Sequence, residues 1–255
     1  MTRLEGQVAL VTGSTRGIGH AIATRLLAEG ADLAVHGRQA SGPGDASARE
    51  IVAAATSQGR RAVRLAADVA AKTEVTRLLE EVGTAFGRLD VLVLNAARAP
   101  FKESPRLLER DLRQLVETNF LANVYLVQRA LPLLEVHGGR IVFISSLGSR
   151  YMSPQYPLGP MKAAMEAMVR HWAEEFRPRG IRSNAVCAGL VRTDAFKTLR
   201  RIWPGLDRLP DDLFVTAEEV ADAVAFLAGP DSRGVNGQTL VVDRGLTNRV
   251  LRDDA

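Results

Sequence analysis

The sequence predicts an α/β fold with a single domain, a doubly wound, Rossmann-type sheet of seven parallel strands with helices on both faces. Short runs rich in Val, Ile and Leu alternate with longer segments of helical period, which is typical of parallel strands joined by crossover helices. The strand segments are apolar on both sides, so helices must cover both faces of the sheet. Hydrophobic residues make up 46% of the 255 residues, and no linker or internal repeat divides them, so we expect one domain over 1–255.

The elements can be assigned in chain order. The expected strands are residues 7–13, 31–37, 61–68, 90–96, 140–146, 181–188 and 238–243. The expected helices are residues 17–29, 45–57, 72–86, 105–135 with an internal break, 160–177 and 217–228. Residues 194–214 fit neither pattern and follow a strand at the carboxyl edge of the sheet, where ligands bind in such folds, so we expect a substrate lid there. An ordinary surface loop is the alternative.

Composition and charge argue against several classes of partner. Lys and Arg outnumber Asp and Glu by 33 to 29, for a formal net charge of +4, but the cations are scattered among acids, as in residues 77–90, so we expect no nucleic-acid partner. No apolar run is long enough to cross a bilayer, the N-terminus lacks the features of a secretory signal, and Cys187 has no second cysteine to pair with. We expect a cytoplasmic protein without membrane association. The 4 histidines lack metal-ligand spacing, so no metal is expected.

A glycine-rich loop directly follows the first expected strand and opens the first expected helix. Glycine lets backbone amides approach a pyrophosphate closely and permits positive φ, and the helix N-terminus adds partial positive charge. Because strand, loop and helix occur in this order, the loop predicts a dinucleotide site in preference to a simple tight turn. Its cofactor-binding residues are Gly13, Ser14, Thr15, Arg16, Gly17, Ile18 and Gly19.

Residues around the second expected strand favour NADP(H) over NAD. An NAD site usually has a carboxylate at the end of this strand, but Asp32 begins the strand, roughly 13 Å from its far end at about 3.3 Å per residue. The strand is followed by Arg38, which can converge with Arg16 on a 2′-phosphate. Ordinary surface charge is the alternative for both arginines. Asp68, at the end of the third expected strand, is a candidate to accept from the adenine amino group or to cap a helix.

These segments resemble the short-chain dehydrogenase/reductase family, and the resemblance extends over nearly the whole chain. It rests on motifs that occur in the family's order: TGSTRGIG, AADV, LNAA, the asparagine of VETNF, RIVFISS, MKAAM, IRSNAVCAGLVRTDA and GQTLVVDRG. The resemblance is more specific for the fold and for a nicotinamide cofactor than for a reaction. It implies further cofactor contacts from Asp68, Val69, Asn95, Lys162, Val191 and Thr193.

The resemblance also implies a catalytic set, and one member of this set is missing. In the family a serine orients the substrate oxygen, a tyrosine exchanges a proton with it, and a lysine lowers the tyrosine pKa and holds the nicotinamide ribose. These roles point to Ser146, with Ser145 as a close alternative, and to Lys162, while Asn119 would hold a water near Lys162 or cap a helix. The tyrosine is expected four residues before Lys162, but Leu158 stands there, and leucine cannot donate a proton.

Tyr156 is the main candidate to replace the missing proton donor, and Tyr151 is the reserve. Pro157 and Pro160 disfavour helical conformation in the residues before them, so the helix is expected to begin at about Pro160 and to leave Tyr156 on an extended approach to the site. The spacing to Lys162 matches neither the common family pattern nor that of the enoyl-thioester reductases, a divergent branch that this region resembles. The alternative is a ring that packs at the nicotinamide edge with its hydroxyl in water.

The sequence thus predicts an NADP(H)-dependent oxidoreductase that transfers hydride to a carbonyl, or to an enone or enoyl group, of a small-molecule substrate. Tyr156 or a water bound by Lys162 would supply the proton. Enoyl reduction is favoured, because it needs mainly stabilisation of an enolate and therefore suffers less from an atypical proton donor. The alternative is a degenerate family member that binds the nucleotide as a non-redox catalyst or regulatory subunit. By resemblance, the apolar stripe of residues 119–136 would form a homodimer or homotetramer interface, unless it is buried within one chain.

Overall fold

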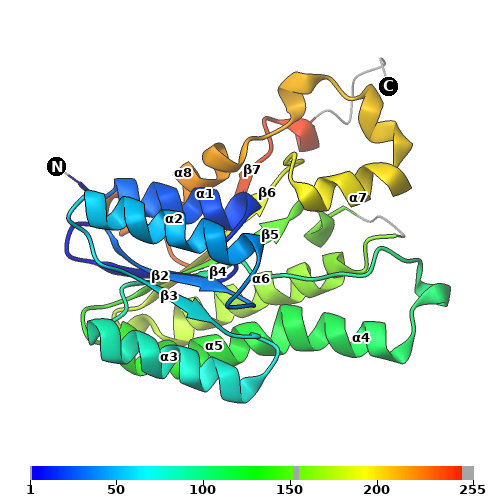
Figure 1. Ribbon diagram of the computed structural model, residues 1–255. Coiled ribbons are helices and arrows are strands. Elements are labelled where there is room, and N and C mark those ends of the chain that lie inside the picture. Colours follow the sequence, from blue (N-terminus) through cyan, green and yellow to red (C-terminus); the bar gives the residue numbers. More distant parts are fainter. Residues whose placement is uncertain (1, 152–154, 249–255) are drawn as a thin grey trace.

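The computed structural model describes residues 2–151 and 155–248 and contains one seven-stranded sheet (Figure 1). Its strand pairs are parallel in the order β3-β2-β1-β4-β5-β6-β7, which confirms the predicted doubly wound, Rossmann-type fold. The chain adds β2 and β3 on one side of β1 and then β4 to β7 on the other side, so the strand order reverses between β1 and β4. In such folds ligands bind at the carboxyl ends of the strands where this order reverses. The strands are β1 Val8–Val11, β2 Asp32–Gly37, β3 Ala62–Ala66, β4 Val91–Leu94, β5 Arg140–Ser146, β6 Arg182–Ala188 and β7 Thr239–Val242.

Helices cover both faces of the sheet, as predicted. In Figure 1, α1, α2 and α8 lie on one face, and α3, α5 and α6 lie on the other. The helices are α1 Gly17–Ala28, α2 Pro43–Ser57, α3 Lys72–Phe86, α4 Glu109–Val116, α5 Ala122–Leu134, α6 Leu158–Glu175, α7 Asp194–Ile202 and α8 Ala217–Ala228. Because successive strand residues point to opposite faces, the sheet contributes side chains to two separate apolar layers.

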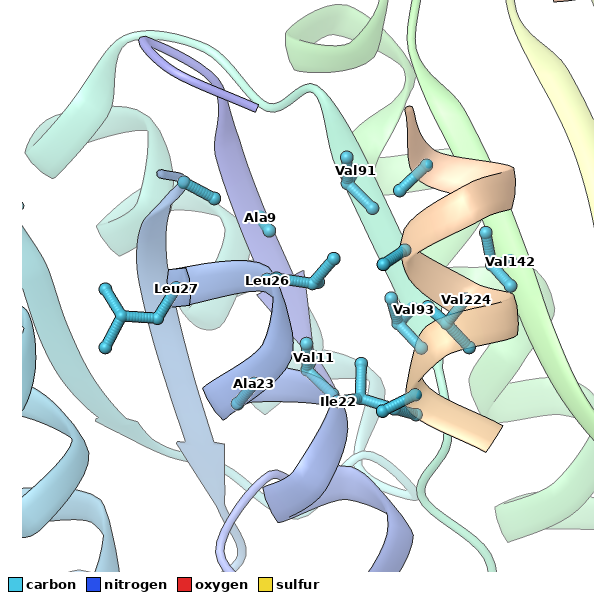
Figure 2. Packing of buried hydrophobic residues seen from close by; sticks show 14 of the residues in the cluster. Ala9, Val11, Ile22, Ala23, Leu26, Leu27, Val91, Val93, Val142 and Val224 are labelled. Carbon is cyan, nitrogen blue, oxygen red and sulfur yellow. The ribbon is translucent and has the colours of Figure 1, made fainter. Parts of the chain in front are cut away.

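The two layers give the sheet a rigid base. In one layer Val11 of β1 packs with Ile22 of α1 and Val224 of α8 (Figure 2). Leu10, one residue earlier in β1, belongs to the opposite layer together with Leu126 of α5. Burial of each such side chain contributes about 1.5–3 kcal/mol, so the strands hold the loops at their carboxyl ends in fixed positions.

The helix that carries the lysine begins two residues earlier than predicted. It starts at Leu158 and not at about Pro160, which is its third residue. The first backbone N–H groups of a helix have no intrahelical acceptor, so Pro160 is accommodated in the first turn. Tyr156 still precedes the helix, as expected.

Two other segments are more helical than predicted. Residues 194–214 contain α7 and two 3₁₀ turns, Pro204–Arg208 and Asp211–Leu213, so this segment is not irregular. The predicted break in residues 105–135 is a π turn at Glu117–Leu121, between α4 and α5. The helical period alone does not reveal a π turn, because the extra residue shifts the pattern without interrupting it.

Candidate active site

The glycine loop between β1 and α1 has the shape that a pyrophosphate needs. Gly13 and Gly17 have φ values of +68° and +54°, in the region of backbone space that favours glycine. A Cβ atom at Gly19 would lie 2.2 Å from the Gly13 carbonyl oxygen, so α1 approaches the loop this closely only because residue 19 is glycine. Asn95, after β4, donates from Nδ2 to the Thr12 carbonyl oxygen at 2.8 Å and holds the start of the loop. These residues fit a dinucleotide phosphate at the N-terminus of α1.

His36, which the sequence analysis did not assign to the site, binds the loop to the sheet. The residue is 2% exposed on β2; its Nδ1 accepts the Gly13 N–H at 3.0 Å, and its Nε2 lies 3.0 Å from the Ala67 carbonyl oxygen. These two contacts require the neutral tautomer with the proton on Nε2. The predicted Ser14 hydroxyl accepts the His36 N–H at 2.8 Å and so also holds the loop to β2. Burial lowers the pKa of His36 to about 4. The sequence signal was a polar side chain inside an apolar strand.

The two arginines predicted to bind a 2′-phosphate lie at the same end of β2. A Cβ atom at Gly37 would lie 2.9 Å from Thr15 Cγ2, so the glycine loop contacts the end of β2. Arg16 follows Thr15 and Arg38 follows Gly37, and both arginines are exposed. Asp32 begins β2 at the opposite edge of the sheet, as expected. The end of β2 is therefore cationic, as the phosphate of NADP(H) requires.

Asp68 and Val69 follow β3, where the adenine is expected. Asp68 is half-buried, and its Oδ1 accepts the Ala70 N–H at 3.0 Å within a turn. The residue that precedes α3 is Ala71, so the alternative of a helix cap for Asp68 is wrong. Val69 is 5% exposed and packs into the core.

The predicted nicotinamide contacts follow β6 and lie beside the glycine loop. Thr193 Cγ2 would be 3.5 Å from a Cβ atom at Gly17. Val191 is 8% exposed and is paired with Val215 in an isolated bridge. Ile18, the remaining loop residue, is half-buried and packs against the core next to α1. Segments far apart in the sequence thus meet at the carboxyl edge of the sheet.

Tyr156 lies against Ser146. Its Oη is 3.4 Å from Ser146 Oγ, and its ring centre is 5.8 Å from that of Phe101. Two glycines make room for this arrangement: a Cβ atom at Gly148 would lie 2.5 Å from the Tyr156 ring, and one at Gly159 would lie 2.3 Å from the Gly148 carbonyl oxygen. Burial raises the pKa of Tyr156, and the hydrogen bond with Ser146 opposes that rise. The site therefore contains two neighbouring hydroxyl groups, Ser146 and Tyr156.

The geometry separates the two adjacent serines of β5. Ser145 is 2% exposed and donates to Glu166 Oε1 at 2.5 Å, on the α6 side of the strand. Ser146 is less buried and contacts Tyr156. Leu158, where the family has its tyrosine, is 6% exposed in the first turn of α6. Ser146 is thus the serine that has a hydroxyl partner in the site.

Lys162 lies one helical turn after Leu158 and points to β5. Its Nζ donates to the Ile144 carbonyl oxygen at 2.6 Å and lies 4.7 Å from the centre of the Phe143 ring. Burial lowers the pKa of Lys162 to about 8. Within residues 2–151 and 155–248, no hydrogen bond joins Lys162 to Tyr156.

Asn119 connects the π turn to the loop after β4. Its Oδ1 accepts the Arg98 N–H at 3.0 Å, and its Nδ2 donates to the carbonyl oxygens of Arg98 at 2.7 Å and Leu115 at 2.9 Å. Its own carbonyl oxygen accepts from Asn123 Nδ2 at 2.8 Å. The side chain therefore positions the loop, and a water near Lys162 stays a prediction.

The remaining site predictions concern Tyr151, metals and membranes. Tyr151, the reserve proton donor, is 50% exposed on the turn after β5. In the part of the chain that the structure describes, no group of three or more His, Cys, Asp and Glu side chains could hold a metal ion. Among the helices of that same part, none combines the length and apolarity needed to span a membrane.

Comparison with known proteins identifies relatives along almost the whole chain. A family model described as "Enoyl-(Acyl carrier protein) reductase" matches residues 13–247. The 1-cyclohexenylcarbonyl-CoA reductase of Streptomyces collinus is 39% identical over an aligned length of 248, and the match covers 94% of this chain and 87% of that protein. A hydroxynaphthalene reductase-like protein of Metarhizium brunneum is 35% identical over an aligned length of 261, and the match covers 95% of each chain.

Solved structures agree with these relatives. A short-chain dehydrogenase from Burkholderia cenocepacia in complex with NADP has a TM-score of 0.84 at 35% identity and covers 95% of this chain and 98% of its own. A blue fluorescent protein from a metagenomic library in complex with NADPH has a TM-score of 0.86 at 32% identity, with the same coverage of 95% and 98%. The predicted resemblance is confirmed, and the chain belongs to the short-chain dehydrogenase/reductase family of oxidoreductases.

Proposed function

We propose that the protein is an NADPH-dependent reductase that adds hydride to the carbon–carbon double bond of an enone or enoyl substrate. The observation that carries this proposal is the pair of hydroxyls of Ser146 and Tyr156, 3.4 Å apart, at a site where the usual proton donor is replaced by the buried Leu158. The relative named 1-cyclohexenylcarbonyl-CoA reductase supports an unsaturated acyl thioester as the substrate class.

The preference for NADP(H) rests on charge at the end of β2. Arg16 and Arg38 are the residues that would hold the 2′-phosphate, and the neighbours solved with NADP and NADPH support this choice. The glycine loop and Asn95 would hold the pyrophosphate side, and Val191 and Thr193 the nicotinamide side. When bound, NADPH supplies the hydride.

Three side chains would act on the substrate oxygen. The hydroxyls of Ser146 and Tyr156 donate hydrogen bonds to the carbonyl oxygen that is conjugated to the double bond. The Lys162 ammonium group would hold the nicotinamide ribose and would contribute positive charge near the oxygen where negative charge develops. Such preorganised donors stabilise the transition state more than they stabilise the substrate.

Burial raises the pKa of Tyr156, so its hydroxyl is a weaker acid than that of a free tyrosine, and an enoyl substrate demands less of such an acid than a ketone does. A neutral tyrosine donates a hydrogen bond without losing its proton. Addition of hydride to the β-carbon places the negative charge on the carbonyl oxygen as an enolate, which the two hydroxyls stabilise. A proton from water then reaches the α-carbon and completes the saturated product. A ketone would instead form an alkoxide, which is more basic than an enolate and must take a proton outright.

Two substrates with the same thioester test the proposal. An α,β-unsaturated acyl-CoA and the 3-oxoacyl-CoA of the same chain length are each mixed with the protein and NADPH, and NADPH absorbance and product masses are followed. We expect the saturated acyl-CoA from the first substrate and little NADPH oxidation with the second. Reduction of the 3-oxoacyl-CoA alone would contradict the proposal and favour carbonyl reduction, the second candidate, which the hydroxynaphthalene reductase-like relative supports. NADPH binding without turnover of either substrate would favour the degenerate, non-redox or regulatory alternative.

The predicted homodimer or homotetramer also becomes a proposal. The apolar stripe of α5, including Leu126 and Leu134, is buried in the core of its own chain. On α4, Leu112 and Val116 are 49% and 40% exposed, and we propose this face for self-association. Light scattering should show an oligomer that Leu112→Glu dissociates, and a monomeric wild type would contradict the proposal. We also propose a cytoplasmic location, with which a chain that has a single cysteine and so no intramolecular disulfide is compatible.

A further inference from the structure

Glu166 is a buried carboxylate beside the site that the proposed reaction does not yet use. It lies on α6, one helical turn after Lys162, and is 7% exposed. Its Oε1 accepts hydrogen bonds from Ser145 Oγ at 2.5 Å and from Ser149 Oγ at 2.6 Å. The Arg150 Nε is 4.0 Å from its Oε2. Burial of a carboxylate costs free energy unless hydrogen bonds and nearby cations compensate it, and here both are present.

The two serines lie on either side of the turn that carries the site. Ser145 ends the buried part of β5, and Ser149 ends the 3₁₀ turn Leu147–Ser149. Between them are Ser146, which contacts Tyr156, and Gly148, against which the Tyr156 ring packs. Glu166 Oε1 therefore connects both ends of a short turn, and the position of this turn determines the distance between the two hydroxyls.

Glu166 also acts on Lys162 through its charge. Burial lowers the pKa of Lys162 to about 8, and electrostatic interactions with Cys187 and then with Glu166 oppose this shift. Two other ionisable groups face this pair. Cys187 of β6 has a pKa raised by burial to about 11, so its thiol is neutral at ordinary pH. The other is Arg150, on the turn after β5, whose Nε lies 4.0 Å from Glu166 Oε2.

We propose that Glu166 is a positioning residue for the reaction proposed above, on which this inference rests. Its Oε1 holds the Ser145–Ser149 turn so that Ser146 and Tyr156 meet one substrate oxygen, and its carboxylate places negative charge one helical turn from the Lys162 ammonium group. The two roles use different properties of one side chain, the acceptor oxygen and the charge. They can therefore be separated by substitution.

Glu166→Gln tests the charge. The amide keeps an oxygen for both serines and removes the negative charge, so Lys162 should lose its proton at lower pH. We expect the alkaline fall of kcat, and the alkaline rise of the NADPH dissociation constant, to move to lower pH together, with near-normal activity at pH values below both. Glu174→Gln, on the exposed face of the same helix, is the matched control and should leave both profiles unchanged.

Ser145→Ala tests the acceptor oxygen. It removes one hydrogen bond and leaves the Glu166 charge in place, so kcat should fall by about tenfold while the pH profile stays where it is. Ser149→Ala should act in the same direction and gives a second measurement if Ser145→Ala folds poorly. Thermal unfolding of each variant excludes a general loss of structure.

The outcomes distinguish this inference from the proposed substrate class. The profiles are measured with whichever substrate the wild type reduces, and the NADPH dissociation constant needs no turnover. Coincident wild-type and Glu166→Gln profiles in both readouts would overturn the charge role. Unchanged kcat in both serine variants would overturn the role of Glu166 in holding the turn.

Discussion

Acid should destabilise this protein through His36. The ring accepts the Gly13 N–H at Nδ1, which requires that Nδ1 carry no proton. Burial lowers the pKa of His36 from 6.5 to about 4 in the folded chain, whereas the unfolded chain has the ordinary value. The unfolded chain therefore binds the proton first as the pH falls. The contribution of His36 to stability is fully present above about pH 6.5 and is lost as the pH falls towards about 4.

The size of the effect follows from the difference between the two pKa values. One pKa unit corresponds to about 1.4 kcal/mol, so the full contribution of His36 to the free energy of unfolding is about 3 kcal/mol. Between about pH 7 and about pH 5, about 2 kcal/mol of it should be lost. Asp68 is the charged group that opposes this shift, because its carboxylate raises the pKa of His36. Its effect is smaller than that of burial.

Urea unfolding at a series of pH values measures this loss. His36→Asn keeps an acceptor oxygen for the Gly13 N–H but does not titrate, so its stability should depend less on pH. The stability difference between wild type and His36→Asn should change by about 2 kcal/mol between about pH 7 and about pH 5. His137→Asn, at an exposed position, is the matched control. A difference between wild type and His36→Asn that is the same at every pH would show that protonation of His36 does not destabilise the fold.

Three further predictions concern the site. Tyr156→Phe should lower kcat by about 10- to 100-fold without weakening NADPH binding, with Tyr151→Phe as the control; an unchanged kcat would remove Tyr156 from the reaction. Arg38→Leu should weaken NADPH binding by about tenfold and leave NADH binding unchanged in calorimetric titrations, because it removes a partner of the 2′-phosphate; equal losses for the two nucleotides would argue against that contact. Gly159→Ala should lower the free energy of unfolding by about 1–3 kcal/mol, since the new Cβ would lie 2.3 Å from the Gly148 carbonyl oxygen. Wild-type stability of this variant in urea would show that α6 can move away from the turn.

The parts of the fold that depend on local patterns were predictable. Alternating apolar strands and amphipathic helices determine a parallel sheet covered on both faces, whatever the details of packing. The glycine loop was equally clear, because the positive φ values of Gly13 and Gly17 and the close approach at Gly19 all require the residue type that the sequence provides. The length of the strand alone was enough to predict that Asp32 lies at the end of β2 far from the ribose of a bound nucleotide.

The parts that depend on tertiary contacts were not predictable. Helical spacing cannot tell whether Tyr156 reaches Ser146, since the residue precedes α6 and its direction depends on contact with Gly148. His36 and Glu166 were missed for a related reason: each is a polar residue among apolar neighbours, and the sequence does not show which hydrogen-bond partners the fold brings to them. Buried polar side chains within apolar elements are therefore the signal to search for.

Hydride transfer from NADPH to the β-carbon of an enoyl substrate is the step on which the proposed function depends. NADPH deuterated at its transferable position is incubated with the protein and an α,β-unsaturated acyl-CoA, and the deuterium in the product is located by NMR and mass spectrometry. We expect a saturated acyl-CoA with one deuterium at the β-carbon and none elsewhere. A product with deuterium on a carbinol carbon, or NADPH that stays unoxidised in the presence of this substrate, would contradict the proposed function.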